Sequence, residues 1–549
     1  MKKIIQLIFV TVLISCSNQN TAQVNETQLI DDLHSYISEL SQDSFLGRGP
    51  ATEGEVLTLS LLERHFSGLN ISPGNNGSYL QEVSVTESTV INNPTLEIRG
   101  DNFAASYRYG DQVMLGTERQ VISSDLIDSE VVFIGYGINA PERNWNDYED
   151  FDAGGKTVIV MVNDPGYRTQ DPAVFNGNRM TYYGRWTYKY AEGALQNADA
   201  VLIIHETGAA AYGWNVVQNS WSGPQISLTD DNQNLDKSQV IGWLSYEVAS
   251  ELFNQAGFDM EDEISKAANG NYAPLYLSDL QASTHIENTI RTSSSNNFIA
   301  LIEGTERPDE TIIYSAHWDH LGQDLALDGD NIYNGAIDNG TGTAALMAIA
   351  KLFAEGVPPE RSIVFLAVTA EESGLLGSQW YAEHPIYPVA TTVANINMDG
   401  LNVYGPMRDV VVVGDGSSEL ENYLSDLVDL QEGRYVTSEP YPERGYYYRS
   451  DHFNFARIGI PAIYFESVKD HFEYGQEYGE QMQQAWNSNI YHSPRDAYDP
   501  EWDLSGLLLD IELYHGLGDV LANDTVFPNW YEGNEFKAIR DATAGERIR

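Results

Sequence analysis

Three short, almost entirely apolar segments of this chain each end in acidic or histidine side chains. Residues 311–316 precede His317, residues 361–370 precede Glu371 and Glu372, and residues 393–398 precede Asp399. Runs that are rich in Val and Ile and separated by helical patterns are typical of parallel strands buried on both faces of an α/β sheet. Ligands of open α/β sheets bind outside the carboxyl ends of the strands. The sequence therefore predicts an α/β fold whose ionisable side chains converge on one crevice.

A helical pattern between these segments brings another carboxylate to the same place. Asp338 comes just before residues 341–355, whose apolar side chains recur at helical spacing. Either Asn339 or Thr341 can cap the start of that helix. Because the helix would begin at the predicted crevice, we expect Asp338 to lie beside the strand ends.

The acidic composition limits the possible partners. The formal net charge is −50, from 80 acidic and 30 basic residues, and no long run of one sign accounts for it. Such an excess repels the phosphates of nucleic acids and of anionic membranes. The composition therefore argues against nucleic acid as a partner, and it favours metal cations.

The first residues are expected to be a targeting segment. Lys2 and Lys3 precede an apolar run, residues 4–14, that is too short to span a bilayer, and Cys16 follows in a sequence that resembles a bacterial lipobox. We expect an exported cell-envelope lipoprotein, in the periplasm or outer membrane, held to the membrane only by a lipid on Cys16. A cleaved signal with a chance cysteine, and hence a secreted protein, is the alternative. Since Cys16 is the only cysteine, an intrachain disulfide and a cysteine-ligated zinc are excluded.

Changes of pattern along the chain suggest four segments. Residues 1–22 are the signal and tether, and residues 23–120 begin the main domain with helices near 26–40 and 53–66. Residues 121–275 alternate strands with loops and lack any histidine–carboxylate cluster with ligand spacing, so they are expected to be an insert. Residues 276–549 return to the main domain and hold the candidate site.

Five of these side chains together suit a metal site. His317, Asp338, Glu372 and Asp399 each follow a predicted strand, and His492 lies far downstream. Two histidines and three carboxylates are ligands that a pair of zinc ions can share, with one carboxylate as a bridge. One of two adjacent glutamates would then be free to act as a general base. An HExxH motif is absent, so a thermolysin-like site is not expected.

Five motifs in a fixed order make a resemblance specific: residues 317–319 (HWD), 335–342 (GAIDNGTG), 370–378 (AEESGLLGS), 397–400 (NMDG) and 491–492 (YH). They resemble those of the di-zinc aminopeptidases of metallopeptidase family 28, and the resemblance covers nearly the whole mature chain. It implies a three-layer α/β/α fold with a mostly parallel mixed sheet. The insert, through residues 135–138 (GYGI) and 188–193, resembles a β-rich protease-associated domain.

The resemblance also implies a ligand set. His317 and Asp399 would hold one zinc ion, Glu372 and His492 would hold the second, and Asp338 would bridge them.

The remaining roles follow from the same resemblance. Glu371 would take a proton from the zinc-bound water, and Asp319 would orient His317. Tyr491 would donate its hydroxyl to the oxyanion, and Arg449 would face the substrate backbone. The implied substrates are peptides, which would lose their N-terminal residue.

Other functions remain open. A glutaminyl-cyclase-like acyltransferase would share the fold but use one zinc ion. A carboxypeptidase or dipeptidase of the same clan would share the site, because the residues that read the substrate terminus lie in loops. A catalytically dead binding protein of the transferrin-receptor kind is disfavoured by the complete ligand set with Glu371. Neither the oligomeric state nor the preferred N-terminal residue follows from the sequence.

Overall fold

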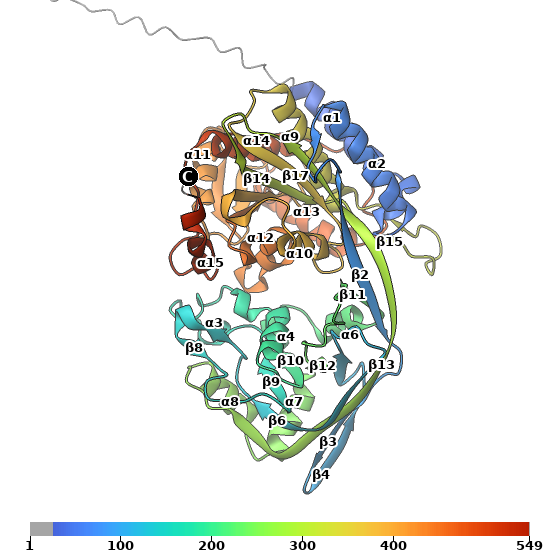
Figure 1. The fold of residues 1–549 in the computed structure, drawn as a ribbon, viewed down its shortest axis with the longest axis vertical. Helices are drawn as coiled ribbons and strands as arrows, with labels where there is room; N and C mark the ends of the chain where they lie inside the picture. The colour runs from blue at the N-terminus through green and yellow to red at the C-terminus, as the bar shows by residue number, and fades with distance from the viewer. Residues whose placement is uncertain (1–25, 548–549) are drawn as a thin grey trace, which may run out of the picture.

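The chain forms two lobes joined along one side (Figure 1). The computed structural model describes residues 26–547, so the expected signal segment and Cys16 lie outside it. We call residues 26–90 and 288–547 the large lobe and residues 91–287 the small lobe. Their boundary is drawn where two paired strands pass from one lobe to the other.

The large lobe is built on a mixed sheet whose central strands are parallel. Its order is β2 (Leu80–Val90), β13 (Leu275–Ile302), β17 (Arg361–Val368), β14 (Arg307–His317), β18 (Thr392–Asn397), β21 (Ala462–Glu466), β19 (Asp409–Val412) and β20 (Tyr435–Ser438). The run from β17 to β21 is parallel, which confirms the predicted α/β class. All residues of β17 and β18 are buried, as expected for strands covered on both faces.

Helices cover both faces of this sheet and make three layers. One face carries α1 (Glu26–Leu40), α2 (Glu53–Gly68), α9 (Gly342–Glu355), α11 (Leu420–Val428) and α14 (Ser505–Asn523). The other carries α10 (Leu376–Glu383) and α12 (His452–Arg457). Across residues 26–547, no helix is both long and apolar enough to cross a membrane.

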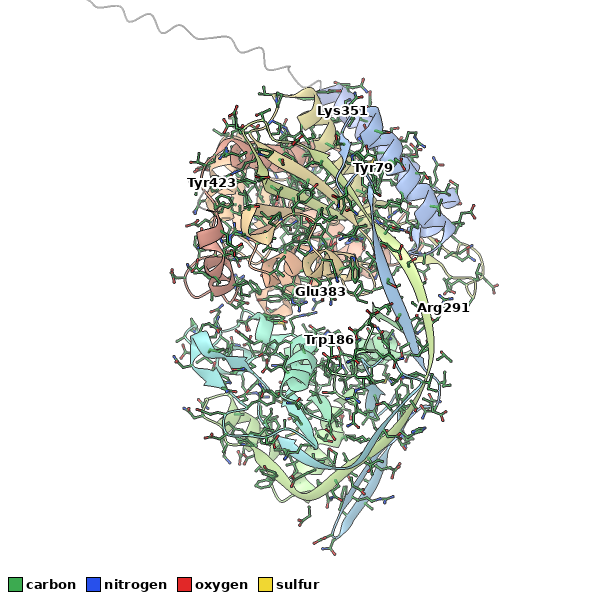
Figure 2. The ribbon with its side chains drawn as sticks, viewed as in Figure 1. Tyr79, Trp186, Arg291, Lys351, Glu383 and Tyr423 are labelled. Carbon is green, nitrogen blue, oxygen red and sulfur yellow. The ribbon has the colours of Figure 1, made fainter. Side chains whose placement is uncertain are left out.

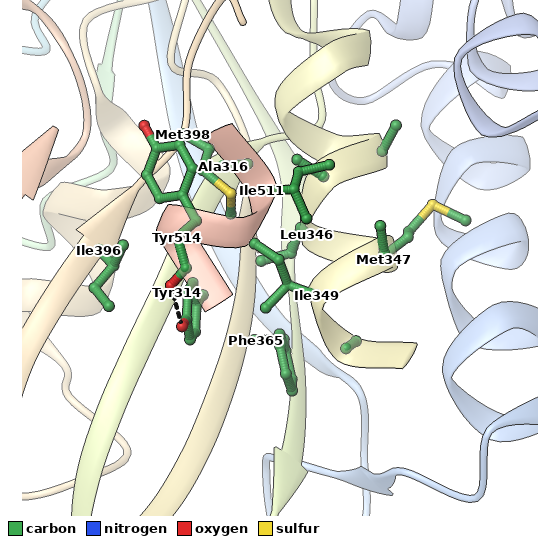
Figure 3. Close-up of a cluster of buried hydrophobic side chains, with 14 of the residues drawn as sticks. Tyr314, Ala316, Leu346, Met347, Ile349, Phe365, Ile396, Met398, Ile511 and Tyr514 are labelled. Atoms are coloured by element: carbon green, nitrogen blue, oxygen red, sulfur yellow. Dashed lines mark hydrogen bonds between the residues drawn. The ribbon is translucent and has the colours of Figure 1, made fainter. Parts of the chain in front are cut away.

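The main core lies between β14, β17 and the helices α9 and α14 (Figure 3). Tyr314 stacks on Phe365 and donates a 2.7 Å hydrogen bond to the Tyr514 carbonyl. Leu346 of α9 is fully buried in the same cluster. Burying one such side chain stabilises the fold by about 1.5–3 kcal/mol. This packing holds the carboxyl ends of the strands and the start of α9 in fixed positions.

The small lobe has its own sheet. Its order is β4 (Phe103–Tyr107), β3 (Leu96–Gly100), β13, β6 (Ser123–Phe133), β9 (Lys156–Met161), β10 (Ala200–Ile204), β12 (Val240–Leu244) and β5 (Val113–Gly116). Helices α4 (Trp186–Leu195), α7 (Tyr246–Gln255) and α8 (Met260–Ala267) accompany it. Strands β3, β4 and β5 precede residue 121, so this lobe includes residues that the sequence had placed in the main domain.

Several features join the lobes, among them the pairing of β2 with β11 (Pro224–Leu228) of the small lobe and the packing of the Tyr182 ring on Phe453 of the large lobe. Strand β13 takes part in both sheets and pairs with β2 between them. Arg179 of the small lobe reaches Asp415 at 2.6 Å and Glu439 at 3.2 Å in the large lobe.

Candidate metal centre

The ends of three adjacent parallel strands deliver most of the candidate residues. His317 is the last residue of β14, Glu371 and Glu372 lie in the turn after β17, and Asp399 follows β18 by two residues. Since β14 pairs in parallel with both β17 and β18, these side chains lie at one edge of the sheet. This is the edge at which α/β sheets bind ligands.

Asp338 lies between two histidines. Its Oδ1 is 3.3 Å from His317 Nε2, and its Oδ2 is 3.2 Å from His492 Nε2. Asp399 Oδ1 lies 3.1 Å from His317 Nε2, and Glu372 Oε2 lies 3.0 Å from His492 Nε2. The structure thus brings the five predicted ligands together, as two histidine–carboxylate pairs on either side of one carboxylate.

These residues fit a pair of divalent cations. His492 Nε2 is buried and, among residues 26–547, has no partner with hydrogen-bond geometry, although two carboxylate oxygens lie within 3.2 Å of it. Imidazole nitrogens and carboxylate oxygens are ligands that zinc prefers. Three carboxylates gathered in a largely buried site also need positive charge, because an unpaired buried charge is costly. The donor set therefore matches zinc in type and in number.

His320 adds a donor beside the second pair. It is buried, its Nδ1 lies 2.6 Å from Glu372 Oε1, and its Nε2 has no partner among the described residues. With Asp338 and Glu372 it forms a further group of atoms close enough to hold a cation. The Glu372 carboxylate is consequently fixed between His320 and His492.

Asp319 contacts His317, as expected, but through its main chain and not through its carboxylate. Its main-chain carbonyl, 3.1 Å away, is the hydrogen-bond partner of His317 Nδ1, and its carboxylate is 3.8 Å away, beyond hydrogen-bond range. That carboxylate instead accepts a 3.2 Å hydrogen bond from the Glu371 backbone N–H. Asp319 therefore fixes the backbone at Glu371, and burial raises the pKa of its own carboxyl to about 8.

Glu371 lies beside the cluster without a side-chain partner. In the described part of the chain no hydrogen bond to its carboxylate is found. One of its carboxylate oxygens lies within 4.8 Å of a possible ligand atom of His317 and of Glu372. Burial raises the pKa of Glu371 well above its usual range, His317 opposes this rise, and the charge of Asp399 adds to it. A carboxyl of this kind suits a group that accepts and returns a proton.

Tyr491 stands at the open side of the cluster. Its side chain is 49% exposed, and its ring stacks on His492 with centroids 3.8 Å apart. Partial burial and the nearby carboxylates, Asp338 first, raise the pKa of Tyr491. The hydroxyl therefore remains a hydrogen-bond donor at neutral pH.

Arg449 lies farther out, at the border with the small lobe. It ends the short helix η7 (Tyr446–Arg449), is exposed, and donates a 2.8 Å hydrogen bond to the Arg444 carbonyl. The next residue, Ser450, donates a 2.7 Å hydrogen bond to Asp399 Oδ2. Arg449 is thus one residue away in sequence from Ser450, which contacts the candidate ligand Asp399.

Asp496 is a site residue that the sequence did not reveal. Its two carboxylate oxygens accept hydrogen bonds from the backbone N–H groups of Ile337 (2.9 Å) and Asp338 (3.0 Å). It is fully buried and follows His492 by four residues. Asp496 therefore links the backbone of Asp338 to the turn that carries His492. Its only sequence signal was that short spacing.

Arg48 supports the same region from the N-terminal segment. It is fully buried and donates hydrogen bonds to the carbonyls of Trp318 (2.9 Å), Asn334 (2.5 Å), Gly335 (2.7 Å) and Leu40 (3.1 Å). One guanidinium thereby joins the turn after His317 to the loop that precedes Asp338.

Parts of this chain are similar in sequence to known proteins. Aminopeptidase NAALADL1 of Mus musculus is 35% identical over 128 residues, which are 22% of this chain and 15% of that protein. Glutamate carboxypeptidase 2 homolog of Caenorhabditis elegans is 29% identical over 161 residues, which are 28% of this chain and 20% of that protein. The alignments thus span a fifth or less of these relatives' own length.

Among solved structures, the aminopeptidase from Aneurinibacillus sp. strain AM-1 can be aligned with most of this chain. Its TM-score is 0.48 at 17% identity, over 90% of this chain and 95% of that chain. Residues 297–514 match the model of peptidase family M28, and they contain all five clustered ligands together with Glu371. The segment that builds the candidate metal centre is therefore related to peptidase family M28.

Proposed function

We propose that this protein is a zinc-dependent aminopeptidase that removes N-terminal residues from peptides. The observation that carries this proposal is the position of Asp338, which presents one carboxylate oxygen to each of two histidines. A carboxylate used in this way suits a bridge between two cations. The similarity of residues 297–514 to an M28 peptidase supports the reaction class.

The proposed zinc ligands form two sets that share Asp338. His317 and Asp399 would hold one ion, and Glu372 and His492 would hold the other, with His320 against Glu372. When bound, zinc supplies Lewis acidity toward the peptide carbonyl and lowers the pKa of water.

The residues of the chain then carry the proton transfers. Glu371 takes a proton from the attacking water and delivers it to the leaving amine, which balances the hydrolysis. Tyr491 donates its hydroxyl to the carbonyl oxygen as negative charge develops there. The negative field of the cleft, with Asp399 and Glu371, attracts the protonated N-terminus of a peptide.

The base can be tested by substitution. Glu371→Gln keeps size and polarity but cannot accept the proton, so kcat on an aminoacyl anilide should fall by about 10²- to 10⁴-fold. Zinc content by elemental analysis should stay at two per chain. Glu383→Gln is the matched control, because Glu383 is an exposed residue at the end of the helix that follows Glu371 (Figure 2). Turnover of Glu371→Gln close to that of the control would exclude Glu371 as the base.

A carboxypeptidase is the second candidate, because relatives of this segment include proteins named glutamate carboxypeptidase. Peptides blocked at one end separate the two activities. An aminopeptidase cleaves a C-terminally amidated peptide and spares an N-acetylated one, whereas a carboxypeptidase shows the reverse preference. Pyroglutamate release from N-terminal glutamine, with one bound zinc, would instead identify a glutaminyl cyclase.

We also infer that the small lobe is an inserted protease-associated domain and that Cys16 carries a lipid anchor. Cys16→Ser should move the protein from the membrane fraction to the soluble envelope fraction. An unchanged distribution would contradict the anchor.

A further inference from the structure

A groove of about 750 Å³ in the large lobe is lined mainly by aromatic rings and carboxylates. The rings belong to Tyr404, His471, Phe472, Tyr474, Tyr478 and Trp502. Among the described residues that line the groove, none is a candidate metal ligand, and the proposed base is also absent. The groove is therefore a different site from the candidate metal centre.

Three of these rings form a cluster at the start of α13 (Gly475–Asn489). The Tyr474 ring stacks on His471 with centroids 4.7 Å apart, and the Tyr478 ring lies 5.1 Å from each of the two. His471 is buried, whereas Tyr474 is 59% exposed. Because its neighbours already hold the Tyr474 ring in place, a ligand that contacts this ring immobilises little side-chain freedom.

The groove carries negative charge. Three acidic side chains line it, namely Glu473, Glu501 and Asp503. Within residues 26–547, no salt bridge to these carboxylates is found, and no lysine or arginine lines the groove. His471 Nδ1 accepts hydrogen bonds from the backbone N–H groups of Glu473 and Tyr474, both at 3.1 Å, so this ring adds no positive charge.

Contacts beside the groove leave its two exposed glutamates without a cation. Asp503 Oδ1 accepts a 3.0 Å hydrogen bond from the Ser505 N–H at the start of α14, so this carboxylate has a local partner. Arg408 does not line the groove, although its guanidinium lies 4.9 Å from the Phe472 ring centroid, and it pairs with Asp470 at 3.2 Å. The charge of Arg408 is therefore balanced by a carboxylate outside the groove.

We propose that this groove binds an organic cation, which is either the ammonium or guanidinium group of a basic side chain or a small quaternary ammonium ion. Aromatic rings attract a cation to their faces, and rings gathered around one position form a cage for it. Carboxylates that lack a basic partner add to this attraction. The site goes beyond the proposed peptidase reaction. Tyr474 precedes α13 and His492 follows it, and a helix of 15 residues is about 22 Å long.

Isothermal titration calorimetry of the zinc-loaded protein with four compounds tests the proposal. N-acetyl-lysine amide and N-acetyl-arginine amide represent basic side chains, tetramethylammonium chloride represents a free quaternary ammonium ion, and N-acetyl-norleucine amide is the uncharged match for lysine. At least one cation should bind about fivefold or more tightly than the norleucine derivative. The cation with the highest affinity identifies the source. A smaller selectivity for all three cations would overturn the proposal.

Substitution of the exposed ring locates the binding. Tyr474→Leu keeps an apolar side chain but removes the ring, so affinity for the cation should fall about 3- to 30-fold, while Tyr474→Phe should keep it within about twofold. Tyr276→Leu is the matched control, because Tyr276 is a 45% exposed tyrosine of β13 outside the groove. Equal affinities in Tyr474→Leu and in this control would place the cation elsewhere and refute the groove as its site.

The carboxylates are tested separately. Glu501→Gln keeps the size of the side chain and removes its charge, so affinity for the cation should fall about two- to fivefold at low ionic strength. Near about 1 M salt this difference should disappear, because exposed charges are then screened. Glu383→Gln again serves as the control. Cation binding that depends neither on Glu501 nor on salt would exclude the acidic side chains from the site and contradict the proposal.

Discussion

At the scale of single residues, the centre depends on a balance between crowded carboxylates and few positive charges. Asp338, Glu372 and Asp399 lie within contact of two histidines, and Glu371 is close by. Burial acts to raise the pKa of the Asp338 and Glu372 carboxyls, and the neighbouring imidazoles lower both pKa values below their usual range. Two cations would resolve this conflict by supplying the charge that the chain lacks.

Removing the bridging carboxylate should remove metal. Asp338→Ala takes a ligand from both proposed ions, so zinc by elemental analysis should fall from two per chain to less than one. Asp324→Ala serves as a control, because Asp324 lies in an exposed loop. Undiminished zinc in Asp338→Ala would rule out a bridge at this position.

Asp496 provides a test of positioning. Asp496→Asn replaces one of two accepting oxygens with an N–H₂ group that faces a backbone donor, so the Asp338 loop should shift. Loss of such an outer partner commonly costs about 10–100-fold in metal affinity. Zinc affinity measured by chelator competition should fall by that amount, whereas Asp499→Asn, an exposed neighbour, should not change it. Equal affinities in the two variants would show that Asp496 has no such role.

Four of the five clustered side chains could be predicted because each follows a strand that can be recognised by pattern. His492 lies far downstream and matches a motif of the family that the chain resembles. The sequence did not reveal Asp496 or the contacts of Arg48, since their partners are backbone N–H and C=O groups, which leave no mark in a sequence. The contact between Asp319 and His317 was difficult to predict for the same reason, because it is made by the main-chain carbonyl of Asp319 and not by its carboxylate.

At the scale of elements, the apolar strands and amphipathic helices were predictable to within a few residues. Helix α1 has the predicted bounds, and β17 ends two residues before the predicted end. Thr341 does not cap α9 with its side chain, whereas Asn339 Oδ1 accepts the Gly342 N–H at 2.9 Å. Which of two adjacent polar residues caps a helix depends on loop geometry that spacing alone does not fix.

Arg48 shows how elements far apart in sequence are held together. Arg48→Met leaves four carbonyl oxygens without their donor. At about 1–3 kcal/mol for each buried group left unpaired, and with water replacing part of the loss, we expect unfolding free energy to fall by about 3 kcal/mol or more. Urea unfolding followed by tryptophan fluorescence measures this change.

Arg64→Met is the matched control, because Arg64 is an exposed arginine that pairs with Glu39. Its effect should stay below about 1 kcal/mol. Similar losses of stability in both variants would contradict a structural role for Arg48.

At the scale of the whole molecule, the two lobes are arranged around the paired strands β2 and β13 and a few polar contacts. The start of the small lobe was difficult to predict, because β3, β4 and β5 are short strands whose pattern does not indicate which sheet they join. Strand β3 pairs with β13, and β5 pairs with β12, in each case across more than a hundred residues of sequence.

The link between Arg179 and the large lobe should control how closely the lobes approach. Arg179→Met leaves Glu439, a buried carboxylate, without its partner and removes a contact to Asp415. We expect a larger radius of gyration by small-angle X-ray scattering. Arg168→Met breaks pairs with Glu206 and Glu261 inside the small lobe and should leave it unchanged. An unchanged radius in Arg179→Met would show that this link does not control the lobe arrangement and that the strands and the other contacts between the lobes, such as Tyr182 with Phe453, are sufficient.

Anomalous diffraction at the zinc absorption edge tests the central claim most directly. Crystals of the zinc-loaded protein should show two peaks about 3.5 Å apart, one on each side of the Asp338 carboxylate. One peak should lie against His317 and Asp399, and the other against Glu372 and His492. A single peak, or peaks away from these side chains, would contradict the account.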